Sequence, residues 1–161
     1  HIEGYPVNPL TEDAPRNLLA DAQKVMVERT EDLALSEGEV NSYLNHRLQG
    51  EQGGMVASLV KYKGTYIDFT PGFAEIFVER EIFGLPLTMS SQIRTETFRS
   101  QVIYRSAGWS IGKIEFNSRN IKPIIEMFER LRSGYQEEFN TMKQMVDVRF
   151  EDNRLVLDAT L

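Results

Sequence analysis

The spacing of apolar residues predicts two helices near the start of the chain. The first occupies about 13–29, and Pro15 suits its first turn because that turn leaves its N–H groups unpaired. The second follows a short extended link at 33–35, and the Ser36 to Glu39 spacing is that of a capping box. Their apolar stripes are Leu18, Leu19, Ala22, Val25 and Met26 in the first helix, and Val40, Tyr43, Leu44 and Leu48, before Gly50, in the second.

Between residues 55 and 116 the helical period disappears, and β-branched and aromatic residues predict antiparallel strands joined as a meander. Pro71-Gly72 indicates a tight turn, after which apolar and polar residues alternate. Gly84 and Pro86 interrupt the pattern, so we expect the following strand to begin after them. The expected strand segments are 56–62, 65–69, 73–83, 87–98, 101–104 and 111–114, with a hairpin turn at 99–100.

The helical period returns from Asn117, with Pro123 in the first turn and a kink or break near Gly134. Its apolar stripe is Ile121, Ile124, Ile125, Phe128 and Leu131, continued by Tyr135, Phe139, Met142 and Met145. Alternation in 146–157 around a turn at 152–153 predicts a closing β-hairpin.

Together these elements predict an α+β fold in which a curved antiparallel meander sheet packs against N-terminal and C-terminal helices. The 161 residues are the length of one ordinary domain, so we expect a single domain over 1–161. Residues 1–12 contain two prolines and no periodic pattern, which indicates an extended N-terminal arm.

Composition and charge narrow the function. The chain has no cysteine, which excludes disulfides, thiolate nucleophiles and cysteine-ligated metals. The net charge of −6 argues against nucleic acid as a partner, since its binding depends on neutralising phosphates. Basic residues nevertheless gather in 94–122, as a solvated strand face or as a patch that meets anionic lipid headgroups. The bases are Arg94, Arg99, Arg105, Lys113, Arg119 and Lys122, against Glu96 and Glu115.

Candidate catalytic groups have simpler structural interpretations. His46 lacks a nucleophile and an orienting acid in any recognised motif, and we expect it on a helix surface. Glu79 and Glu81 share one strand face, as a glycosidase pair would, but a wet face also explains them. The glycines lack the spacing of a phosphate-binding loop. We therefore predict no catalytic residues, no metal and no cofactor, and a protein that is not an enzyme.

The segment 36–44 reads Ser-x-x-Glu-Val-Asn-x-x-Leu. It resembles the second-helix motif of small exported bacterial proteins related to the tubular lipid-binding (TULIP-like) fold. The turn at Pro71-Gly72, the Ile-Gly-Lys-Ile step at 111–114 and the closing hairpin occur in the same order there. The resemblance spans about 16–158. One departure is that such proteins often have a proline soon after the Ile-Gly-x-Ile step, whereas here Pro123 lies well downstream.

The resemblance implies an exported protein of the periplasm or the outer face of the cell envelope, with a leader or anchor removed before His1. It also implies an elongated apolar space between sheet and helices that accepts a lipid or acyl chain. Contact with a membrane surface or another envelope protein is a further expectation. The predicted lining is Ile76, Val78, Val102, Tyr104, Ile124, Phe128 and Leu131. The alternative is a filled core, in a structural or protein-interaction module of the bacterial envelope that binds no ligand.

Overall fold

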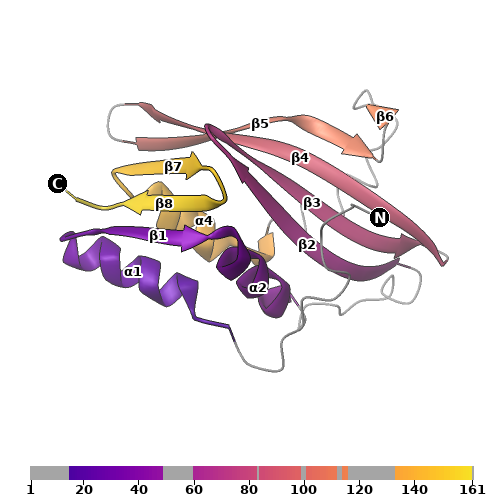
Figure 1. Ribbon diagram of the computed structural model, residues 1–161, viewed down its shortest axis with the longest axis horizontal. Helices are drawn as coiled ribbons and strands as arrows, with labels where there is room; N and C mark the ends of the chain where they lie inside the picture. Colours follow the sequence, from indigo (N-terminus) through magenta and orange to yellow (C-terminus); the bar gives the residue numbers. More distant parts are fainter. Residues whose placement is uncertain are drawn as a thin grey trace.

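The computed structural model describes residues 15–48, 60–82, 84–98, 101–111, 114–115 and 133–160. They form an α+β fold with two antiparallel sheets (Figure 1), which confirms the predicted meander, the packed helices and the closing hairpin. The helices are α1 (Leu18–Glu28), α2 (Glu37–Leu48) and α4 (Gln136–Lys143). The strands are β1 (Asp32–Ser36), β2 (Val60–Thr70), β3 (Phe73–Ile82), β4 (Leu85–Phe98), β5 (Gln101–Ile111), β6 (Ile114–Glu115), β7 (Asp147–Glu151) and β8 (Arg154–Asp158).

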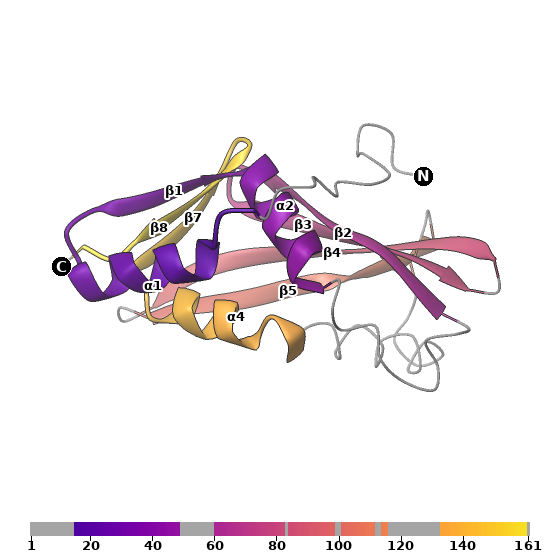
Figure 2. The same ribbon diagram turned by 90° about the horizontal axis from the view of Figure 1, so that it is seen from below.

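The larger sheet has the order β2-β3-β4-β5-β6, and the smaller one has the order β1-β8-β7. In Figure 1 the strands β2, β3 and β4 extend well beyond the smaller sheet. Helices α1 and α4 lie side by side below the smaller sheet (Figure 2), and they contact each other. The curvature of the larger sheet stays a prediction.

Helix α1 begins later than predicted. The Asn17 Oδ1 atom accepts the Ala20 N–H at 3.1 Å, so Asn17 caps the helix and Pro15 lies before it. The prediction that Pro15 belongs to the first turn is therefore wrong, because an asparagine two residues later supplies the cap. At the other end Arg29 adopts a left-handed conformation with φ of 52°, and its N–H reaches the Val25 carbonyl at 2.8 Å.

The predicted link at 33–35 is part of strand β1. Leu33 and Leu35 are buried and pair with Leu157 and Leu155 of β8. The alternation is too short to indicate a strand by itself, and its partner lies at the opposite end of the sequence. The closing hairpin thus gains a third strand and forms a sheet of its own.

Two strand boundaries also differ from the prediction. The segments 56–62 and 65–69 were expected as separate strands, but 60–70 is one strand in which Lys63 forms a bulge, since Tyr62 pairs with Arg80 and Gly64 with Glu79. Strand β4 includes Pro86, which pairs with Glu81 of β3. Strand β5 pairs with β4 only from Met89 onward, so the proline, which has no N–H to donate, interrupts no hydrogen bonds between β4 and β5.

The turns and the C-terminal elements agree with the prediction. Gly72 and Gly84 have φ values of 87° and 80°, and Asn153 in the closing hairpin has φ of 57°. A turn at Tyr135, directly after Gly134, precedes α4. The predicted arm 1–12, the strand start at 56–59 and the helix at 117–132 lie outside the described residues.

Side-chain hydrogen bonds attach helix α2 to the outer edge of strand β2. Asn41 accepts the Ile67 N–H at 2.6 Å and donates to its carbonyl at 2.9 Å. Asn45 does the same to Thr65, at 2.9 and 2.6 Å. Glu37 accepts the Phe69 N–H at 3.0 Å. The predicted capping box is present as well, because the Ser36 N–H and hydroxyl donate to Glu39 at 2.9 and 2.7 Å, and the Glu39 N–H donates to the Ser36 hydroxyl at 3.3 Å.

Candidate functional site

A cavity of about 270 Å³ lies where α1, α2 and α4 meet both sheets. Its lining is mostly apolar and draws on every described helix and on seven strands, β1 to β5, β7 and β8. Leucine, isoleucine and aromatic side chains dominate because these faces are the apolar stripes of their elements. Representative lining residues are Leu18, Leu35, Leu44, Ile67, Ile76, Ile93, Phe139, Met142 and Leu157.

The structure brings three of the seven predicted lining residues to this cavity: Ile76 and Val78 of β3, and Tyr104 of β5. Val102 is buried in the hydrophobic core and is absent from the lining. It pairs with Thr97, one position from the Phe98–Gln101 pair at the end of the β4–β5 hairpin. Ile124, Phe128 and Leu131 lie outside the described residues. Binding of a ligand by any of these residues stays a prediction.

A carboxylate forms part of the lining. The Tyr43 hydroxyl donates to Glu138 Oε1 at 2.8 Å, and Arg47 Nε donates to the same oxygen at 3.2 Å. The side chain of Glu138 is 14% exposed, against 70% for its neighbour Glu137, so Glu138 faces inward. Burial, and then the contact with Glu138, raise the pKa of Tyr43, while the pKa of Arg47 is raised by Glu138. This charge-assisted cluster joins α2 to α4.

Two polar atoms in the lining are buried without a hydrogen-bond partner. They are Glu138 Oε2 and Tyr104 Oη, and neither atom has a hydrogen-bond partner among the residues that the structure describes. The Tyr104 ring contacts Phe139 edge-on, with centroids 5.8 Å apart, so Tyr104 of β5 lies beside α4, the helix that also carries Glu138. Burial raises the pKa of Tyr104, so its hydroxyl remains protonated. An unpaired buried polar atom costs about 1–3 kcal/mol.

The sequence analysis did not single out Glu138 as a residue of the site. The signal was present, because Glu138 follows Tyr135 by three residues and precedes Met142 by four. That spacing puts it inside the predicted apolar stripe, where a carboxylate needs buried partners. The sequence predicts Tyr43 in the apolar stripe of the second helix. Its hydrogen bond to Glu138 could not be predicted, because it joins two helices that are far apart in the sequence.

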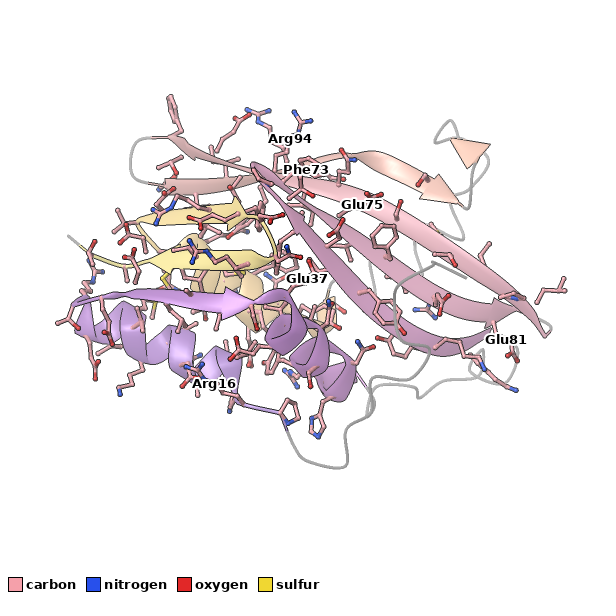
Figure 3. All side chains as sticks on the ribbon, in the orientation of Figure 1. Arg16, Glu37, Phe73, Glu75, Glu81 and Arg94 are labelled. Atoms are coloured by element: carbon pink, nitrogen blue, oxygen red, sulfur yellow. The ribbon has the colours of Figure 1, made fainter. Side chains whose placement is uncertain are left out.

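The other candidate groups lie away from the cavity. His46 is exposed on α2, as predicted. Glu81 pairs with Lys63 at 2.9 Å and Lys61 at 3.3 Å, and these lysines lower its pKa. It lies toward the end of the larger sheet that extends past the smaller one (Figure 3). These contacts agree with a solvated strand face.

The basic face predicted within 94–122 is present in part. Arg94 and Arg105 are exposed and directly opposite each other on β4 and β5. Glu96 pairs with Arg105 at 2.8 Å, which offsets one of the two charges. The other bases of this group, Arg99, Lys113, Arg119 and Lys122, lie outside the described residues. Contact of this face with anionic headgroups stays a prediction.

No protein-family model matches this chain, and a search of curated proteins gives no match either. None of the helices in the described ranges has the length and apolar character needed to cross a membrane. Within the same ranges, no three histidine, aspartate or glutamate side chains are grouped as metal ligands would be.

Proposed function

We propose that this protein binds a lipid or another apolar ligand in the cavity between its sheets and helices, without catalysing a reaction on it. The supporting observation is the mostly apolar cavity of about 270 Å³. Ligand pockets typically have volumes of roughly 300–1,000 Å³ and a few polar groups in an apolar lining. The cavity is slightly smaller than this range, so its volume suits one acyl chain better than a lipid with two chains.

We further propose, from the resemblance of 36–44 and the ordered motifs, that the protein acts in the bacterial envelope as an exported protein. In this setting the exposed Arg94 is suited to contact an anionic membrane surface while the cavity holds the ligand.

Native mass spectrometry of protein purified without detergent, followed by organic extraction, tests the proposal directly. A co-purifying lipid, or uptake of a fluorescent acyl-chain probe, is the expected result. An Ile76→Phe variant fills the cavity and should weaken probe uptake, whereas Ile103→Phe, on an exposed side chain of the same sheet, should leave uptake unchanged. Absence of both lipid and probe uptake in the unmodified protein contradicts the proposal.

The alternative function is a structural or protein-interaction module of the envelope. Exposed apolar side chains favour it, because Phe98 is 59% exposed and Ile103 37% exposed beside the β4–β5 hairpin. Crosslinking in intact cells distinguishes the two functions. The module predicts a defined protein partner lost in Phe98→Ser and no bound lipid, whereas the ligand-binding function predicts lipid retention in that variant.

A further inference from the structure

Two side chains of the cavity lining each carry a buried polar atom that has no hydrogen-bond partner among the described residues. Glu138 Oε1 is engaged by Tyr43 and Arg47, while Glu138 Oε2 is buried without a partner. Tyr104 Oη is buried without a partner as well. A purely apolar ligand would leave both atoms unpaired, so the chemistry of this lining points to a ligand with a polar end.

We propose that the ligand is a single-chain amphiphile whose polar end is a neutral hydroxyl group. The hydroxyl hydrogen is donated to Glu138 Oε2, and a hydroxyl oxygen of the same polar end accepts the hydrogen bond of Tyr104. The chain lies against the apolar lining formed by residues such as Ile76 and Met142. This inference rests on the proposed function, and it specifies the class of ligand.

A fatty acid fits this lining poorly. Its carboxylate has no hydrogen to donate to Glu138 Oε2 and adds a second negative charge beside that oxygen. Arg47 does not remove the conflict, because its single positive charge is already balanced by Glu138, whose Oε1 lies 3.2 Å from its Nε. Like charges in a partly buried site repel more strongly than in water. The geometry therefore selects alcohols over acids of equal chain length.

The test uses three probes with the same eight-carbon chain: octan-1-ol, its methyl ether and octanoate. Each is titrated into the full chain against a fluorescent acyl-chain probe. Octan-1-ol should displace the probe about tenfold more effectively than the ether, which accepts a hydrogen bond but cannot donate one. Octanoate should be the weakest of the three.

Variants of Glu138 make the test sharper. In Glu138→Gln the oxygen must stay toward Tyr43 and Arg47, which both donate, so the amide NH₂ replaces the free acceptor Oε2. The preference for alcohol over ether should then disappear, and octanoate should gain affinity. The matched control Glu137→Gln, on an exposed neighbour in α4, should retain the preferences of the unmodified protein. Tyr104→Phe should weaken the alcohol and the ether to a similar extent, because both oxygens accept from Tyr104.

The outcomes separate the inference from the function on which it rests. Equal displacement by all three probes in the unmodified protein, or tighter binding of octanoate, overturns the inference while ligand binding stands. Failure of the acyl-chain probe and of all three compounds to bind overturns both. Circular dichroism of each variant confirms that a change in affinity is read from folded protein.

Discussion

Arg149 joins three strands of the smaller sheet through four carboxylates. Its guanidinium lies 3.1 Å from Asp147, 3.5 Å from Asp32, and 3.7 Å from both Glu151 and Asp158. The side chain is 43% exposed, so each single pair is screened by water and contributes little, about 0–1 kcal/mol. The arrangement matters more as a group, because without Arg149 the four negative charges would face one another.

We predict that Arg149→Gln lowers the free energy of unfolding by about 1 kcal/mol at pH 7, and by much less at pH 3.5. The direction of this pH dependence follows from the ionisation of the carboxylates. Hydrogen bonds from Thr160, with a smaller contribution from Arg149, lower the pKa of Asp158, so this group stabilises the fold above its unfolded pKa and loses that effect as pH falls. In the variant the carboxylates repel when ionised, so the deficit grows as pH rises through their pKa values.

Urea denaturation at the two pH values measures this difference. Lys24→Gln is the control, because its exposed pair with Glu28 spans 4.0 Å and involves one carboxylate. Equal losses at pH 3.5 and pH 7 in Arg149→Gln would show that the arginine acts through packing of its stem rather than through charge.

At the scale of elements, α2 covers the edge of β2, because the spacing of side chains along the helix matches the spacing of backbone groups along the strand. Glu37, Asn41 and Asn45 are four residues apart and bond to Phe69, Ile67 and Thr65, which are two residues apart. Four helical residues rise about 6.0 Å and two strand residues rise about 6.6 Å, so successive side chains meet successive backbone groups. The helix therefore satisfies a strand edge that otherwise invites pairing with another chain.

Replacing both Asn41 and Asn45 by alanine should lower the free energy of unfolding by about 2–6 kcal/mol and promote aggregation. The estimate counts the buried N–H and carbonyl groups of Thr65, which lose their partners at about 1–3 kcal/mol each, while the groups of Ile67 are only partly buried and add less. Chemical denaturation and light scattering measure the two effects. Ser42→Ala, on the same helix and outside this row of contacts, is the control. Unchanged stability in the double variant contradicts this account of the edge.

The sequence predicts those elements whose signals are local. Ser36 and Glu39 are close enough in the chain for the capping box to be recognised, and the turn at Pro71-Gly72 needs four residues. Strand β1 was missed because Leu33 pairs with Leu157 at the opposite end of the chain. The four-residue spacing of Asn41 and Asn45 is likewise present in the sequence. The sequence does not show that these side chains bind strand β2.

The candidate site was harder to predict for a related reason. Ile76 and Val78 were correctly placed on one face, but an apolar face has the same composition whether it fills a core or lines a cavity. What separates the two is whether side chains fill the space between the elements, and this depends on the relative placement of helices and strands such as α4 and β5. Such placement is set by tertiary packing.

At the scale of the whole molecule, backbone hydrogen bonds join a turn of the larger sheet to the hairpin of the smaller one. The Gly72 N–H donates to the Phe150 carbonyl at 3.0 Å, and the Asn153 N–H donates to the Phe69 carbonyl at 3.1 Å. The rings of Phe69 and Phe150 stack with centroids 5.8 Å apart, and both residues are buried. The turn of one sheet thus binds the hairpin of the other, and both contribute to one hydrophobic core.

This junction predicts that the sheets lose stability together. Phe150→Ala removes a buried ring beside Phe69 and should cost about 3–5 kcal/mol. Native-state hydrogen exchange should show reduced protection in β2 and β3 as well as in β7 and β8, because the sheets share one core. Val27→Ala, at a side chain that is 75% exposed, should change neither sheet. Loss of protection confined to β7 and β8 would contradict this account, because it would mean that the hairpin opens by itself while β2 and β3 stay folded.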